Sequence, residues 1–126
     1  MAGQAGLQEA SGQTASAVIA VDMVFRALAD PTRRQVLERL GSRPASVTEL
    51  AAPFEMALPS FMQHLKLLEE SGLVRSHKQG RVRTYTLQSE PLKAAEDWLG
   101  RQRSLWEARL DRLDTYLLTM KEQEET

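Results

Sequence analysis

A chain of 126 residues with 42% hydrophobic and 26% charged residues has the composition of one folded domain. Its net charge of −1 excludes overall basicity as a signal for nucleic-acid binding, and the absence of cysteine excludes disulfide bonds and thiolate metal sites. No apolar run reaches the length of a membrane span, and the first residues lack the basic and apolar regions of a signal peptide. We therefore expect a cytoplasmic protein with no membrane contact.

The first part of the chain predicts a tail and two helices. Residues 1–16 are mostly Gly, Ala, Gln and Ser, which bury too little to fold, so we expect a disordered tail. Apolar residues then recur at helical spacing through Leu28, which predicts a first amphipathic helix. Asp30 is placed to cap a second helix that has Pro31 in its first position and stops at Gly41.

Two more helices and a hairpin follow. Ser46 and Glu49 have the spacing of a capping box and begin a short third helix that Pro53 ends. A fourth helix is predicted from about Leu58 to Ser71. The next residues are rich in Thr, Val and Tyr around a glycine, which predicts a β-hairpin. The fold class is therefore mainly α with a small β-hairpin, arranged as a winged helix-turn-helix over residues 17–90.

The fourth helix divides into two faces on a wheel of 100° per residue. The apolar face, which we expect in the core, consists of Leu58, Phe61, Leu65 and Leu68. The opposite face, with His64 at its border, consists of Pro59, Ser60, Gln63, Lys66 and Glu70. Gln can pair with adenine, Ser can meet either base type, and Lys can meet guanine or phosphate. This face can therefore enter a DNA major groove, although a solvated helix face that binds nothing has the same pattern.

The predicted hairpin is basic. It carries four cations and no acid between Ser71 and Ser89: Arg75, Lys78, Arg81 and Arg83. From Ala57 to Leu87 there are five Lys or Arg and two Asp or Glu, so the local charge is +3. A charge of one sign favours phosphate contact over an edge hairpin that is merely kept soluble, and it makes DNA binding the preferred interpretation.

Arg33 and Arg34 fall in the first turn of the second helix, where the helix dipole disfavours cations. Something must offset this cost. We expect an ion pair with Asp30, Glu38 or acids of the last helix, in preference to a phosphate contact.

A long last helix is predicted over residues 91–121, followed by a short disordered tail of residues 122–126. It carries an apolar stripe at heptad-like spacing, made of Leu99, Trp106, Leu110, Leu113, Leu117 and Met120. One small core does not need so long a stripe, so we expect a homodimer interface, shared with Phe25, rather than an intramolecular cap. Trp98 and Trp106 further suggest a groove between the paired helices for an unidentified small apolar effector.

Four stretches together resemble a known family, the ArsR-like (arsenic-repressor-like) winged-helix transcriptional regulators. They are "FRALADPTRRQVLERL", "VTELA", "HLKLLEESGLV" and "GRVRTYTL", which cover roughly residues 20–90 in the family's order and spacing. The resemblance implies a homodimeric winged helix that usually represses transcription. It places the wing at Lys78 through Arg83 and the recognition helix at Leu58, Pro59, Ser60, Gln63 and His64.

The chain departs from the family pattern at several positions. The family often has Ser where this chain has Ala57 and Met62, which bears on the DNA sequence that is bound. Metal-sensing relatives use a Cys-x-Cys pattern where this chain has Ser46 and Thr48, and a second metal site on the last helix needs His, which this helix lacks. We therefore expect no metal ion and no other cofactor.

These observations predict a dimeric, sequence-specific regulator of transcription. Its partners would be double-stranded DNA and a second copy of the chain, and its expected action is repression at an inverted repeat in a promoter. The alternative is a winged-helix module for protein–protein contact that does not bind DNA. An enzyme is not expected, because the sequence contains no recognisable set of catalytic groups.

Overall fold

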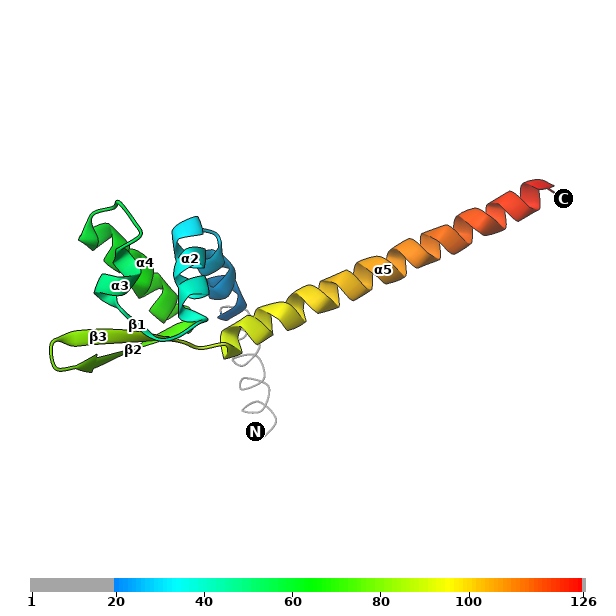
Figure 1. The fold of residues 1–126 in the computed structure, drawn as a ribbon. Helices are drawn as coiled ribbons and strands as arrows, with labels where there is room; N and C mark the ends of the chain where they lie inside the picture. The colour runs from blue at the N-terminus through cyan, green and yellow to red at the C-terminus, as the bar shows by residue number, and fades with distance from the viewer. Residues whose placement is uncertain (1–19, 126) are drawn as a thin grey trace, which may run out of the picture. The chain divides into compact units, whose positions relative to one another are not determined.

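The computed structural model describes residues 20–125 and separates into two compact units (Figure 1). The first unit runs to Ala95 and the second begins at Glu96. After a helix over residues 20–28, the elements are α2 (Pro31–Leu40), β1 (Ala45–Ser46), α3 (Val47–Ala51), α4 (Leu58–Glu70), β2 (Val74–Gln79), β3 (Val82–Leu87) and α5 (Glu90–Glu125). The predicted tail of residues 1–16 lies outside the described residues.

The helix starts follow the predicted local signals. The carboxylate of Asp30 accepts a hydrogen bond from the backbone N–H of Arg33 at 3.1 Å, and Pro31 occupies the first turn of α2. At α3 the hydroxyl of Ser46 accepts from the backbone N–H of Glu49 at 3.2 Å. Both predicted caps are therefore confirmed.

The hairpin is also confirmed, and the structure adds a strand to it. The sheet has three antiparallel strands in the order β1-β3-β2, with Ala45 opposite Tyr85 in the added pair. Gln79 faces Val82 across the turn, and Gly80 has a φ of 64°, a conformation that favours glycine. β1 was not predicted, because two residues carry no periodicity and only their pairing with the edge of β3 defines them as a strand.

The core of the first unit lies between the helices and the sheet. Its fully buried side chains include Val24, Val36, Leu50, Phe61, Leu65, Leu68, Leu73 and Tyr85. Burial raises the pKa of the Tyr85 phenol, and the nearby charge of Glu69 adds to this effect. Ala95 is also buried, so the first two turns of α5 belong to this unit.

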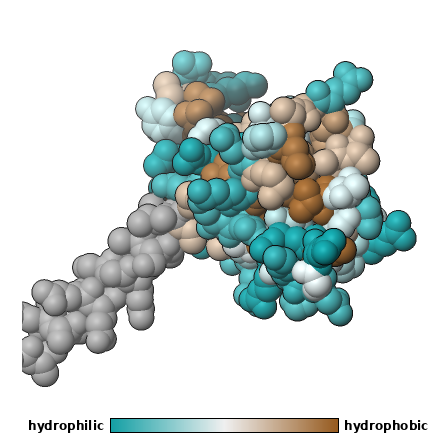
Figure 2. Space-filling view, turned by 90° about the vertical axis from the view of Figure 1, so that its left-hand side faces the viewer, coloured by the Kyte–Doolittle hydropathy of each residue, from teal (hydrophilic) through white to brown (hydrophobic). Residues whose placement is uncertain are grey.

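One core prediction for α4 is wrong. Phe61, Leu65 and Leu68 are buried as expected, but the Leu58 side chain is 56% exposed. A helical wheel treats every position alike, whereas Leu58 is the first residue of α4 and the packed core is reached only from Phe61 onward. Figure 2 views the first unit from the side to which the hairpin tip points in Figure 1, and hydrophobic side chains gather there among hydrophilic ones.

The second unit consists of a single stretch of α5. We expected disorder from residue 122, but the helix continues to Glu125, in keeping with the good helix propensity of its Lys, Glu and Gln residues. Among residues 20–125, no helix is long and apolar enough to cross a membrane.

Candidate nucleic-acid interface

The start of α4 presents short polar and apolar groups to solvent. Leu58, Pro59, Ser60 and Gln63 are all exposed. Ala57 supplies no side-chain cap, so the first free N–H groups of the helix remain available to another acceptor. The amide of Gln63 and the hydroxyl of Ser60 can donate and accept hydrogen bonds, which are the groups needed to read base edges.

The hairpin forms the second part of the site. Lys78 and Arg83 lie opposite each other in the register, and Arg81 follows Gly80 in the turn; all three cations are exposed. Two like charges directly opposite are unfavourable in an isolated hairpin. The Arg83 guanidinium on β3 donates to the hydroxyl of Ser76 on β2 at 2.8 Å, a bond between the two strands of the hairpin. The hairpin therefore concentrates positive charge that an anion can neutralise.

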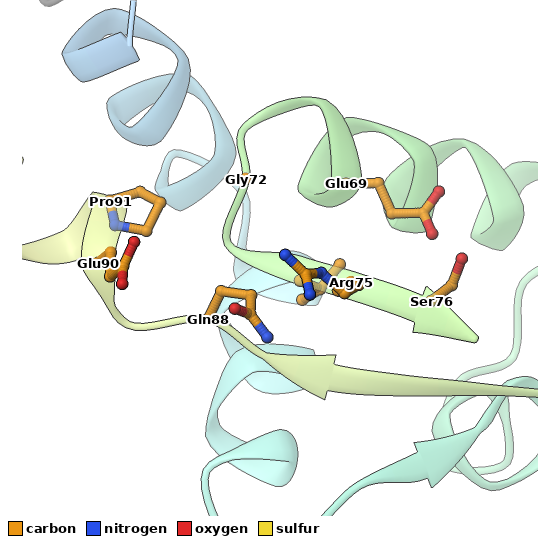
Figure 3. Close-up of a pocket in the computed structure, with 8 residues that line it drawn as sticks. Glu69, Gly72, Arg75, Ser76, Gln88, Glu90 and Pro91 are labelled. Carbon is orange, nitrogen blue, oxygen red and sulfur yellow. The ribbon is translucent and has the colours of Figure 1, made fainter.

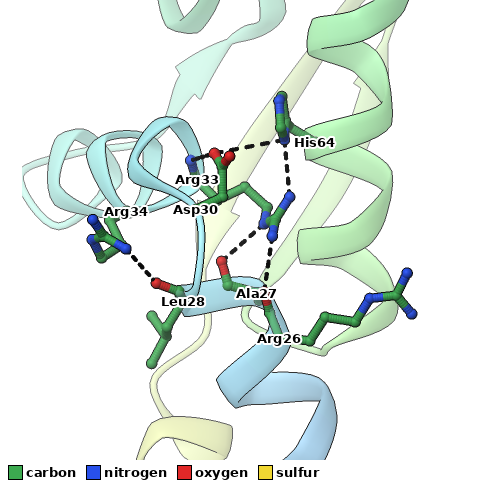
Figure 4. A network of polar contacts seen from close by, with 7 residues as sticks. All are labelled: Arg26, Ala27, Leu28, Asp30, Arg33, Arg34 and His64. Atoms are coloured by element: carbon green, nitrogen blue, oxygen red, sulfur yellow. Dashed lines mark hydrogen bonds and ion pairs between the residues drawn. The ribbon is translucent and has the colours of Figure 1, made fainter.

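His64 points into a network inside the protein (Figure 4). Its Nδ1 lies 3.1 Å from Nη1 of Arg33 and 3.8 Å from a carboxylate oxygen of Asp30. The side chain is 23% exposed. This predicted DNA-binding residue therefore joins the recognition helix to the start of α2, and its Nδ1 is already occupied.

Within residues 20–125, Arg33 and Arg34 form no direct side-chain ion pair of the kind expected from the sequence, although the charge of Arg33 does act on Asp30. Arg33 donates to the backbone carbonyls of Ala27 at 2.9 Å and Arg26 at 2.8 Å, and Arg34 donates to that of Leu28 at 2.7 Å (Figure 4). These carbonyls belong to the last turn of the helix over residues 20–28, which carries negative partial charge. The negative partial charge at the C-terminal end of the first helix thus offsets the unfavourable position of these two cations at the start of α2.

Asp30 lies at the centre of this network. Partial burial acts to raise the pKa of its carboxyl group, but the hydrogen bond from the Arg33 backbone and the charges of His64 and Arg33 outweigh burial. The pKa of Asp30 is consequently below its usual value. The carboxylate therefore stays ionised at neutral pH, where it caps α2 and faces the His64 ring.

Two hollows border α4 in the first unit. One, of about 420 Å³, includes four predicted site residues, Ser60, Gln63, His64 and Lys66, together with Arg26, which the sequence analysis did not single out. Arg26 precedes the DPTRR stretch and lies far from α4 in sequence, so only its position in space marks it.

The other hollow, of about 460 Å³, lies between the end of α4, β2 and the start of α5 (Figure 3). Glu69, Arg75 and Glu90 give it mixed charge, and no predicted DNA-binding residue lines it. Gly72 is held against Pro91, since a Cβ on Gly72 would lie 3.3 Å from the proline ring. This hollow lacks the one-signed charge of the hairpin and is not part of the candidate interface.

The predicted dimer residues fall into two groups. Phe25 is partly buried and packs against the core of the first unit. Those in the second unit are 42–68% exposed: Leu99, Trp106, Leu110, Leu113, Leu117 and Met120. An apolar groove of about 550 Å³ runs along the same helix between Trp98 and Leu110. Within residues 20–125 there is no group of three or more His, Cys, Asp or Glu that could hold a metal ion.

Comparisons with known proteins place this geometry in a family. Residues 28–77 match the model of a helix-turn-helix domain family. The transcriptional repressor SdpR of Bacillus subtilis is 30% identical over 76 residues, which cover 60% of this chain and 84% of that protein. The transcriptional activator HlyU of Vibrio cholerae is 35% identical over 95 residues, which cover 75% of this chain and 84% of that protein.

A solved structure is similar in both sequence and fold. The crystal structure of the ArsR family transcriptional regulator RHA00566 is 59% identical, with a TM-score of 0.68, and the match covers 70% of this chain and 91% of that one. The exposed start of α4, the basic hairpin and the similarity to these proteins all indicate the same family. This protein belongs to the ArsR-like family of winged-helix transcriptional regulators.

Proposed function

We propose that this DNA-binding regulator, which like the other members of its family is not an enzyme, acts as a homodimer that represses a promoter by binding an inverted repeat. The observation that carries the proposal is the combination, in one compact unit, of an exposed and uncapped start of α4 with a wing of three exposed cations. Repression is favoured because occupying promoter DNA is sufficient for it. SdpR is a repressor and HlyU an activator, so the sign of regulation needs its own measurement.

In this proposal the first two turns of α4 enter the major groove. Gln63 and Ser60 contact base edges, and Leu58, Pro59 and His64 line the contact, with the His64 ring held by Arg33. Lys66 contacts a phosphate or a guanine. The wing residues Lys78, Arg81 and Arg83 neutralise backbone phosphates and release counterions, which gives affinity without base specificity.

Dimerisation is supported by the apolar stripe of the second unit. Six large apolar side chains at 42–68% exposure along one helix would be costly in water unless another surface covered them. A second copy would cover them by pairing its own α5, with Phe25 at the edge of the interface. A twofold dimer would then present two recognition helices about 34 Å apart, the spacing of one DNA turn.

The groove along α5 also supports a site for a small apolar effector at the dimer interface. It is lined by Trp98, Leu99, Trp106 and Leu110, and its surface is mostly apolar. Titration of the dimer with candidate apolar compounds should change tryptophan emission, and unchanged emission across a broad panel would argue against the site. The protein would act in the cytoplasm, where promoter DNA is found in bacteria such as those of its relatives.

The experiment that tests the proposal is selection of bound duplexes from a random pool, followed by repression assays on a reporter that carries the selected site. We expect enriched sequences to contain two inverted half-sites about 10 base pairs apart, centre to centre. A protein–protein module would give no enrichment and no saturable complex at low salt. A reporter that the protein activates would instead overturn the repressor assignment while preserving DNA binding.

A further inference from the structure

The hollow beside α4 is positively charged. Arg26, Arg33 and Lys66 line it together with a single carboxylate, Glu70, so these four groups have a net charge of +2. The same hollow includes Ser60 and Gln63, which belong to the proposed base-reading surface. None of the wing residues lines it, so its charge is separate from that of the hairpin.

The three cations of this hollow differ in whether their side chains have bonding partners. Arg33 is committed to two backbone carbonyls and to His64. Within residues 20–125, the side chains of Arg26 and Lys66 are exposed and make no hydrogen bond or ion pair, even though Glu70 lines the same hollow. In Figure 4 the Arg26 guanidinium points away from the Arg33 network. Arg26 therefore has all its donors available next to the recognition helix.

We propose that Arg26, assisted by Lys66, binds backbone phosphates of the DNA strand that borders α4 on the flank facing residues 26–33. This inference rests on the proposed function, because it assigns an additional contact to the same DNA complex. A guanidinium offers paired N–H donors that match two phosphate oxygens, and it keeps its charge at any physiological pH. Together with the wing, the contact would hold the duplex at two separate points, with base reading by Ser60 and Gln63 between phosphate anchors.

The fold allows the side chain to be removed without disturbing the network. Arg33 bonds the backbone carbonyl of Arg26, which Arg26→Ala retains. Arg26→Gln keeps part of the side-chain stem and a neutral N–H donor group, but removes the charge and the guanidinium. Arg43→Ala is the matched control, because Arg43 is an exposed arginine outside the hollow with no side-chain partner among the described residues.

The test measures the affinity of the full-length protein for a selected duplex between 50 and 200 mM salt. The slope of log K against log salt is negative, and each lost phosphate contact makes it less steep by about 0.9. Arg26→Ala and Arg26→Gln should both show this change. We expect affinity at low salt to fall several-fold while the ranking of different duplexes stays the same. Arg43→Ala should retain the wild-type slope.

Neutral methylphosphonates placed singly along the duplex locate the contact. A methylphosphonate at one position beside the half-site should weaken wild-type binding clearly more than Arg26→Ala binding, because that variant has already lost the main partner of the phosphate and retains only Lys66 there. Wild-type slopes in both Arg26 variants would overturn this inference and leave the proposed function intact. If the wild-type protein formed no saturable complex with any duplex, the proposed function itself would fail.

Discussion

Gln63 and Leu58 are two exposed side chains of α4 that would recognise different groups on a DNA base. The amide of Gln63 is exposed beside Ser60, and the Leu58 side chain is 56% exposed at the first turn of the same helix. An amide reads adenine by two hydrogen bonds, whereas an aliphatic side chain can recognise only the methyl group of thymine. The two residues therefore lead to different tests.

Gln63→Ala should relax the base preference at one position of each half-site. A bidentate contact contributes about 1–3 kcal/mol of discrimination, so the preference for the selected base should fall at least several-fold. Competition between duplexes that differ at that position measures the change. A variant that binds more weakly but with the original preference would show that Gln63 does not read a base.

Leu58→Ala tests recognition of a methyl group. We expect the wild-type protein to prefer thymine over deoxyuridine at one half-site position by a few-fold, in keeping with roughly 1 kcal/mol for an apolar contact. Leu58→Ala should bind both duplexes equally well. Equal wild-type affinity for the two duplexes at every half-site position would exclude this role.

Asp30→Ala should destabilise the fold by about 1 kcal/mol, because it removes the cap of α2. The pKa of Asp30 is lowered in the folded state, so its stabilising effect is complete above the unfolded value of about 3.9 and disappears as the pH falls through the folded value. Urea unfolding between pH 3 and 7 should therefore show the variant and wild type converging only below about pH 4. Asp30→Ser, which keeps a cap, should lose less stability at pH 7.

At the scale of elements, the wing and α4 have separate tasks. The hairpin projects three cations from a turn set by Gly80, and Tyr85 on β3 is buried in the core, which fixes the base of the hairpin. α4 is fixed by its own buried side chains and by the bond between His64 and Arg33. Affinity from the wing should thus be separable from specificity in α4.

Arg81→Ala/Arg83→Ala should weaken binding to all duplexes to a similar degree. Loss of two phosphate contacts should make the slope of log K against log salt less steep by up to about 1.8. Thr86→Ala, an exposed neutral change in the same hairpin, serves as the control and should bind like the wild type. Wild-type affinity and slope in the double variant would show that the wing does not touch DNA.

At the scale of the whole molecule, the two units have different sources of stability. The first has its own core, from Val24 to Ala95. The second is a stretch of helix whose apolar side chains are exposed, and a single helix in water gains little from them. We therefore expect the second unit to depend on association with another copy.

Leu113→Glu should convert the dimer to a monomer without unfolding the first unit, because Leu113 is 50% exposed and outside its core. Sedimentation velocity would measure the change, and binding to the inverted repeat should fall to that of a single half-site. Ser104→Glu adds the same charge on the opposite side of the helix and should leave the dimer intact. A wild-type protein that is monomeric at micromolar concentration would contradict the dimer proposal.

The sequence alone determined the order and the ends of most elements. Asp30, Ser46 and Gly80 act through groups within a few residues of themselves, so their caps and turn could be predicted from local pattern. The basic hairpin and the polar face of α4 were likewise visible, because charge and helical spacing are properties of the chain.

Only the tertiary structure decided which side chains remain available. Arg26 and Arg33 are the same residue type a few positions apart, yet the Arg33 side chain bonds two carbonyls and His64, whereas the Arg26 side chain has no partner among residues 20–125 and lies beside α4. The two-residue strand β1 and the exposure of Leu58 likewise depend on what the fold brings near them. The physical reason is that such contacts join groups distant in the chain, and no local periodicity records how closely those groups approach after folding.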